Sequence, residues 1–337
     1  MKKLIKDKYD KELSKYGIIP EVEINISTRI QICKDFTNKI FATFKDFPIT
    51  YIQLYMRVYC IKIRFAKIKG IRKAFYFYKN NTIYISKEVL ESANLKSFLY
   101  IEIIHAIQDF GNIELKNKRA GLVRFKDTKL YGIGLNEGAI QYIVSKMENS
   151  KIKKYTFSSF SIYSISDSYK FMTSLIQQII TLVGEHHILE SLFLSNSIFE
   201  KNLENIYEGE TSKIINNMDK LFSISTTHKH SNKEIIEIYN KTYRMIISKY
   251  FTQTIDLITE LHEIKTMHIL LDELNEIAPD GDTFFFDNRE KYNQQLNQLY
   301  KKIENEKKNN ALVEVKNNPI SQLFKKINEA LVNIILE

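Results

Sequence analysis

Tryptophan is absent from the sequence, and residues that crosslink or interrupt a chain are scarce: two cysteines, four prolines and ten glycines among 337 residues. The cysteines, Cys33 and Cys60, show no C-x-x-C spacing, which excludes a disulfide framework and a zinc site built from cysteines. Few prolines and glycines leave little room for low-complexity linkers. No apolar run is long enough to cross a bilayer, so the sequence predicts no transmembrane helix.

The remaining composition is that of a folded protein, with 44% hydrophobic and 26% charged residues. A chain of this length forms one large domain or two ordinary ones. Residues 1–8 are charged from the start and lack the apolar segment of a secretory signal. We therefore expect a soluble cytoplasmic protein.

Positive charge is concentrated near the N-terminus. Residues 1–80 carry 18 Lys and Arg against 7 Asp and Glu, a net charge of +11, whereas the rest of the chain has a net charge of −2. A one-sided basic region could bind nucleic acid, anionic lipid or an acidic protein, although a solvated basic surface is the simpler explanation. If the partner is nucleic acid, Tyr76 and Tyr78 could stack on bases, and six cations between residues 62 and 73 could bind phosphates. These cations are Lys62, Arg64, Lys67, Lys69, Arg72 and Lys73.

Hydropathy periodicity divides the chain into a first part that contains strands and a second part that is mainly helical. The pattern predicts helices over 2–16 and 27–46, β character over 49–86, and a hairpin of strands 74–78 and 82–86. Further helices are predicted over 95–110, 136–149, 168–183, 186–195, 197–207, 211–222, 232–260, 286–306 and 319–336. The last two form a C-terminal helical hairpin, and 112–133 is a long connection.

These patterns predict an α+β fold in three regions. A basic α/β region with the hairpin covers residues 1–94, a helical lobe covers 95–277, and the C-terminal helical hairpin covers 278–337.

Two segments carry the strongest functional signal. Residues 98–108 include Ile101-Glu102-Ile-Ile-His105, and residues 132–142 include Asn136-Glu137-Gly138. Together with the preceding strand, they resemble the active-site helices of gluzincin-type zinc metallopeptidases. That superfamily carries H-E-x-x-H on one helix and its third ligand, a glutamate, on a following helix.

The resemblance implies a zincin-like fold and assigns a role to each matching position. Glu102 takes the place of the general base, His105 and Glu137 take the places of two metal ligands, and Ile101 stands where the first histidine ligand is expected. The strand Thr82, Ile83, Tyr84 and Ile85 takes the place of the edge strand that binds substrate. A catalytic zinc requires three protein ligands and one open position, and here only two ligands remain.

Helix geometry is consistent with a lost ligand. Glu102, His105 and Asp109 lie within about 60° of one another on one margin of the helix, and Ile101 lies about 40° beyond His105. The main apolar stripe does not need an isoleucine there. We therefore expect a catalytically inactive or impaired metallopeptidase-like protein without a cofactor. It would bind a peptide or protein in the former active-site cleft, between the 82–86 strand and the two motif helices.

An active metallopeptidase with an unusual ligand set is the alternative. Asp109 lies one turn after His105, and His187 could reach the site from a later helix, so either residue could replace the missing ligand. Zinc or another divalent metal would then be bound, with a carboxylate-rich set favouring manganese or iron. Binding of nucleic acid or an acidic partner through residues 1–80 is the remaining alternative.

Overall fold

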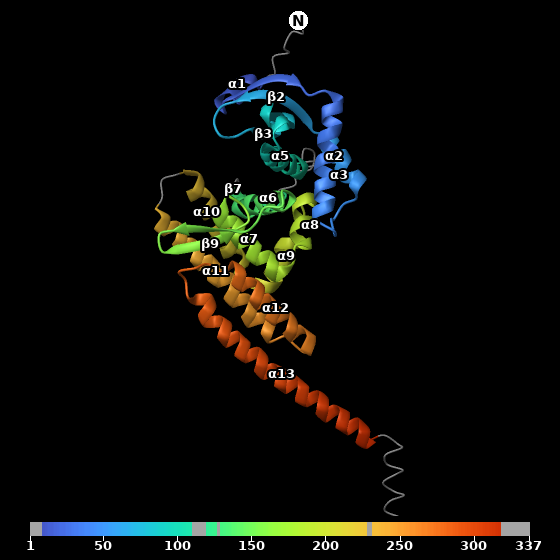
Figure 1. Ribbon diagram of the computed structural model, residues 1–337, viewed down its shortest axis with the longest axis vertical. Helices are drawn as coiled ribbons and strands as arrows, with labels where there is room; N and C mark the ends of the chain where they lie inside the picture. Colours follow the sequence, from blue (N-terminus) through green and yellow to red (C-terminus); the bar gives the residue numbers. More distant parts are fainter. Residues whose placement is uncertain (1–8, 110–118, 127–128, 228–230, 318–337) are drawn as a thin grey trace, which may run out of the picture. The chain divides into compact units, whose positions relative to one another are not determined.

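The computed structural model describes residues 9–109, 119–126, 129–227 and 231–317. They form a mixed α and β fold that is mainly helical, as expected (Figure 1). Contacts group the chain into two units, the first of residues up to 250 with 276–282, and the second of 251–275 with residues from 283 onward. The basic N-terminal region and the motif helices thus share one unit, whereas the sequence places a boundary at 94–95.

The first unit begins with a four-stranded sheet and the helices around it. Its strands lie in the order β1-β2-β4-β3, with β2 and β4 parallel and the outer pairs antiparallel. The elements are α1 (Asp10–Lys15), β1 (Ile18–Glu23), α2 (Ile26–Thr43), α3 (Tyr51–Cys60), β2 (Lys62–Ile68), β3 (Ala74–Phe77), η1 (Tyr78–Asn80), β4 (Thr82–Ile85), α4 (Glu88–Glu91), η2 (Ala93–Leu95) and α5 (Lys96–Asp109).

The predicted hairpin is confirmed, but its edge strand was assigned wrongly. β3 and β4 pair antiparallel, and Asn81 makes the turn with a left-handed backbone (φ 48°). β4 lies between β2 and β3, and all four of its residues are buried. The backbone of Thr82–Ile85 therefore pairs with strands on both sides, and the edge beside α5 is β3 instead.

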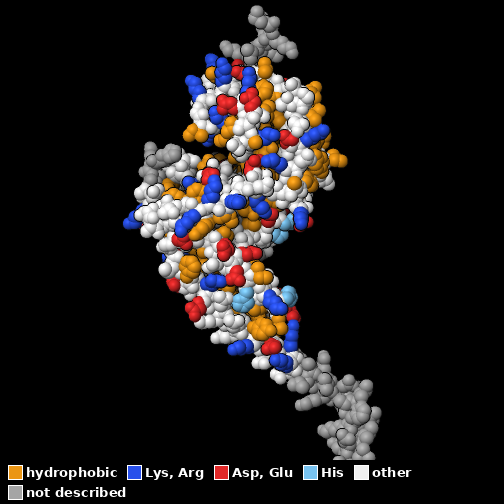
Figure 2. Space-filling view, viewed as in Figure 1, with side chains coloured by type: hydrophobic (Ala, Val, Ile, Leu, Met, Phe, Trp, Pro, Cys, Tyr) orange, Lys and Arg blue, Asp and Glu red, His pale blue; other side chains and the backbone are white. Residues whose placement is uncertain are grey.

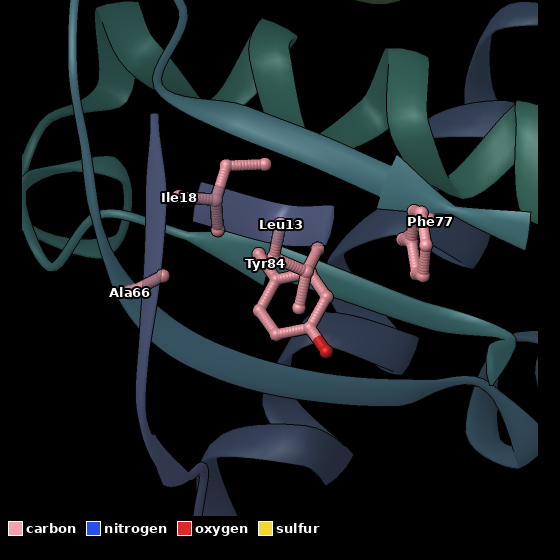
Figure 3. Packing of buried hydrophobic residues seen from close by; sticks show 5 residues of the cluster. All are labelled: Leu13, Ile18, Ala66, Phe77 and Tyr84. Atoms are coloured by element: carbon pink, nitrogen blue, oxygen red, sulfur yellow. The ribbon is translucent and has the colours of Figure 1, made fainter. Parts of the chain in front are cut away.

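One face of the sheet is covered by α1 and the other by α5 (Figure 1). On the α1 side, one hydrophobic side chain from the helix packs against one from each strand (Figure 3). These five buried residues are Leu13, Ile18, Ala66, Phe77 and Tyr84. Side chains alternate between the two faces of a strand, so Ala74 and Tyr76, which alternate with Phe75 and Phe77 along β3, face α5.

Helix α3 corrects the prediction of β character from residue 49 onward. Its β-branched and aromatic residues favour strands. A capping box nevertheless begins the helix, with the Thr50 side chain bound to the Gln53 backbone and the Gln53 side chain bound to the Thr50 backbone. Leu54 and Val58 then fall on one buried face, one turn apart.

The rest of the first unit is mainly helical. The 112–133 connection contains a small sheet over residues 119–131, and the hairpin β8–β9 was also not predicted. The elements are β5 (Arg119–Ala120), β6 (Val123–Lys126), β7 (Lys129–Tyr131), α6 (Ile133–Met147), β8 (Lys153–Phe157), β9 (Phe160–Ser164), α7 (Lys170–Val183), α8 (His186–Leu194), α9 (Ile198–Tyr207), α10 (Thr211–Thr227) and α11 (Asn232–Ile255), whose last turn belongs to the second unit.

The second unit contains most of α12 (Leu261–Ile277), which the sequence did not predict, and α13 (Phe284–Asn317). The predicted helix over 286–306 is confirmed within α13, and its predicted partner over 319–336 lies outside the described residues. Stacking of Phe251 on Tyr292, with ring centroids 4.7 Å apart, holds α13 in this unit. Among the helices that the structure describes, none is long and apolar enough to cross a membrane.

Candidate functional site

Helix α5 presents its acidic and imidazole side chains on one margin. Its buried residues, including Leu99, Ile103 and Ile107, anchor the helix in the core. Glu102, His105 and Asp109 are spaced by three and four residues, so they lie one above the other along the helix. The predicted alignment of these three groups is therefore confirmed.

The start of helix α6 is fixed by a carboxylate from α10. Asp219 accepts hydrogen bonds from the backbone N–H groups of Gly132 and Gly134, both at 2.8 Å. Gly132 has a left-handed backbone (φ 84°), and a Cβ on Gly134 would lie 2.1 Å from the Met218 carbonyl oxygen. The G-x-G segment therefore allows the backbone of α6 to approach α10 closely, which places Glu137 one turn into the helix.

The two motif helices meet at His105 and Glu137. The His105 Nε2 atom lies 3.4 Å from the Glu137 Oε1 atom. The side chains are 25% and 16% exposed, so a ligand can still reach them. The sequence placed both residues at one site, and the structure brings them together.

Glu102 is held against the edge of the sheet. Its Oε2 atom accepts a hydrogen bond from the Tyr76 backbone N–H at 2.8 Å. Burial raises the pKa of the Glu102 carboxyl, and the Glu137 charge adds to this; His105, the Tyr76 N–H and Arg72 act in the opposite direction. The Glu102 carboxylate therefore already accepts the hydrogen bond of the outward-facing Tyr76 N–H, which an added peptide strand would otherwise accept.

Tyr76 also contacts the third acidic group of α5. Its hydroxyl donates a hydrogen bond to the Asn81 Oδ1 atom at 3.2 Å and lies close enough to Asp109 for the two groups to interact electrostatically. Burial raises the pKa of the Asp109 carboxyl, although the Tyr76 hydroxyl and His105 lower it. Burial and the Asp109 charge raise the pKa of Tyr76, so the phenol stays protonated and donates.

Tyr169 and Arg72 complete the electrostatic surroundings of the site. Tyr169, at the N-terminal end of α7, has a left-handed backbone (φ 46°). Burial raises the pKa of Tyr169, and the charges of Glu137 and Glu102 raise it further, while Arg72 lowers it. Sequence reasoning missed Tyr169, because its position depends on a backbone conformation that a tyrosine rarely adopts.

A buried amide pair locks the motif helices together behind the site. Gln108 Nε2 donates to Asn136 Oδ1 at 3.0 Å, and Asn136 Nδ2 donates back to Gln108 Oε1 at 3.3 Å. The same Asn136 oxygen accepts from the Leu122 N–H at 3.0 Å. A Cβ on Gly121 would lie 2.4 Å from the Gln108 amide nitrogen, so the connection needs glycine there. The asparagine of the N-E-G segment thus has a structural role.

The proposed substitute ligands have other surroundings. Asp109 lies beside the Tyr76 hydroxyl, and His187 lies on α8 beside His186, with the two ring centroids 5.7 Å apart. Across the described residues, no three or more His, Cys, Asp or Glu side chains are grouped so that they could hold a metal ion.

A cavity of about 270 Å³ lies on a different side of α5. Leu99 and Tyr100 line it together with residues of α2 and α4. Lys96 and Asp35, whose Nζ and Oδ2 atoms are 3.1 Å apart, also line it. None of the acidic groups around His105 lines this cavity.

Comparison of the chain with protein-family models, with curated proteins and with solved structures gave no match. What the site can do therefore follows from its own geometry. Three carboxyl groups, one imidazole and two tyrosines gather where α5 and α6 meet the edge strand β3. Such a set can bind a cationic group and exchange protons with it.

Proposed function

We propose that the chain is a zincin-like protein that acts by binding a peptide or protein segment rather than by hydrolysing it. The contact between His105 and Glu137 carries the proposal. It joins the two helices at the residues that the resemblance to gluzincins assigns to metal binding. Ile101, at the position of the first ligand, has no atom that can coordinate a metal.

Hydrogen bonding supports a binding role. A general base has to reach a metal-bound water, but Glu102 is bound to the backbone of β3 instead. Glu102 would have to leave this partner before it could serve hydrolysis. Asp109, one of the two substitute ligands, lies beside the Tyr76 hydroxyl, which lowers the pKa of its carboxyl.

The charges of the site indicate the class of ligand. Glu102, Asp109 and Glu137 provide three acidic groups, against one guanidinium from Arg72 and the His105 imidazole. A buried carboxylate gains most from a cation that also donates hydrogen bonds. We therefore expect a ligand with a free ammonium group, either the amino terminus of a peptide or a lysine side chain.

The test is a binding titration with fluorescent peptides that differ only in a free or an acetylated amino terminus and lysine. Binding of the free-amine peptide, its loss on acetylation and at least tenfold weakening in Glu137→Gln would support the proposal. Glu237→Gln, which removes an exposed carboxylate from α11, is the control and should bind normally. Equal binding of all peptides by all variants would contradict the proposal.

The active metallopeptidase remains a separate prediction that the same sample can test. Elemental analysis of protein purified without chelator measures metal content, and mass spectrometry of the peptides measures cleavage. Stoichiometric metal together with cleavage that Glu102→Gln abolishes would replace the binding proposal with an enzymatic one.

A further inference from the structure

Helix α3 has an apolar face on its outer side as well as on its buried side. Leu54 and Val58 are fully buried, whereas Ile52 is 74% exposed and Met56 is 49% exposed. Tyr55 and Tyr59, each three residues after one of these two, extend the outer stripe. A surface helix of a globular protein normally carries polar side chains there.

The start of helix α2 extends this apolar surface. Arg29 of α2 lies over the Tyr59 ring, 5.9 Å from its centroid, which places the first turn of α2 beside the end of α3. Ile26 begins that turn and is 69% exposed. We call the set Ile26, Ile52, Tyr55, Met56 and Tyr59 the α2–α3 face; Figure 2 shows hydrophobic side chains gathered over these helices.

The α2–α3 face belongs to a firmly built part of the fold. The capping box at Thr50 begins α3, and the Tyr51 hydroxyl donates to Asn38 of α2 at 2.7 Å. The Arg57 side chain donates to the carbonyl oxygen of Phe193 at 2.8 Å. Exposure of the outer side chains is therefore a property of a fixed helix pair.

Exposed cations flank the same surface. Lys34 lies one turn before Asn38 on the side of α2 that faces α3, and Lys62 follows α3 directly. Both side chains are exposed. The region that carries the face, residues 1–80, has a net charge of +11, and the rest of the chain has a net charge of −2.

We propose that the α2–α3 face docks onto an anionic lipid surface. Isoleucine and methionine side chains that stand out from a helix can enter the boundary between headgroups and acyl chains, and tyrosines suit that boundary because one end of the ring is polar. Basic residues beside them gain from the negative potential of anionic lipids. Apolar exposure and positive charge coincide at the α2–α3 face, as such docking requires.

A partner protein is the less favoured occupant. A protein interface pairs exposed anchor residues with matching pockets, and Ile52 and Ile26 are exposed on a surface where no pocket is found beside them among the described residues. Neither the cavity lined by Leu99 and Tyr100 nor the one lined by Phe286 and Arg289 includes a residue of the α2–α3 face. A lipid surface accepts protruding side chains without a matching pocket.

The test is co-sedimentation of the full chain with vesicles of phosphatidylcholine alone or mixed with phosphatidylserine. We expect binding to the mixed vesicles, weakening in high salt, and a loss of about tenfold or more in Ile52→Glu/Met56→Glu. Lys34→Glu/Lys62→Glu should weaken binding to mixed vesicles only. The control is Leu257→Glu/Ile269→Glu, which changes two exposed apolar residues of the second unit and should bind normally.

Circular dichroism and thermal unfolding establish that each variant is folded. Equal binding by wild type and Ile52→Glu/Met56→Glu would overturn the proposal, as would absence of binding to the mixed vesicles. If sedimentation equilibrium shows a dimer that this variant abolishes, without vesicle binding, a second copy of the chain covers the face instead. Peptide binding at His105 and Glu137 is measured separately, so each proposal can fail alone.

Discussion

Gln108 of α5 and Asn136 of α6 donate a side-chain hydrogen bond to each other, with N–O distances of 3.0 and 3.3 Å. Both residues are almost fully buried, at 3% and 2% exposure. Asn136 precedes Glu137, and Gln108 follows His105 by three residues. The pair therefore fixes the register of the two helices at the point where the site forms.

Replacing Asn136 with alanine should cost about 2–4 kcal/mol in the free energy of unfolding. The change leaves the Leu122 N–H and the Gln108 amide without the partner that Asn136 provides, in a place that water does not reach. Urea unfolding followed by circular dichroism measures this loss. The double variant Gln108→Leu/Asn136→Leu should lose less than the sum of its single changes, because both ends of the pair go together. Strict additivity would show that the two amides act independently.

Gly134→Ala should destabilise the protein by about 1–3 kcal/mol, although alanine favours helices over glycine. The added Cβ would lie 2.1 Å from the Met218 carbonyl oxygen, so α6 and α10 would have to separate. Gly138→Ala is the graded comparison, because its Cβ would lie 3.0 Å from the Met172 Cβ and 3.1 Å from the Met172 carbonyl carbon, a milder overlap than the one at Gly134. The midpoint temperature of thermal unfolding should be highest for wild type, lower for Gly138→Ala and lowest for Gly134→Ala. Stabilisation by Gly134→Ala would contradict the close approach of α6 and α10.

The sequence predicted the chain of helices well, because apolar residues recur at helical spacing over α2, α5, α7 and α9. The prediction from the sequence is wrong at α3. The tyrosine, isoleucine and valine residues there are typical of a strand, whereas the start of the helix depends on the capping residue Thr50. The sequence also failed to give the order of strands. Hydropathy shows that β4 is apolar, but not that β3 lies outside it.

For the site, spacing on one helix predicted the alignment of Glu102, His105 and Asp109, and the motif pair predicted Glu137 beside His105. Partners from outside the motifs could not be predicted in the same way. Tyr76 reaches Glu102 through its backbone and Asp109 through its hydroxyl, which depends on the sheet order. Asp219 lies on α10, 85 residues after Gly134 in the sequence.

Glu102 makes stability depend on pH. Its pKa is higher in the folded state than the ordinary value of 4.5, so the folded protein binds this proton more tightly than the unfolded chain does. The contribution to stability is full below pH 4.5 and is lost as the pH rises through the folded-state pKa. Glu102→Gln removes this titration and keeps an oxygen that can accept the Tyr76 N–H. The free energy of unfolding should therefore fall less in Glu102→Gln than in wild type between acid and neutral pH.

Urea unfolding across that pH range tests the expectation, with Glu237→Gln as the control for an exposed carboxylate. The control curve should run parallel to that of the wild type. Parallel curves for wild type and Glu102→Gln would show that burial does not raise the pKa of Glu102.

Ile101→His tests the proposal that Ile101 stands at the position of a metal ligand. Residue 101 lies one turn before His105 on α5, so the new imidazole would share a face with His105 and approach Glu137. Three ligands with an open position suit zinc, and we expect this variant to retain about one zinc per chain after dialysis, with tighter binding than wild type. Isothermal titration and elemental analysis measure the gain. Ile101→His/Glu137→Gln should lose it, because the glutamate provides the third ligand. If both variants bind zinc no better than wild type, Ile101 does not occupy a ligand position and the resemblance to gluzincins fails at this helix.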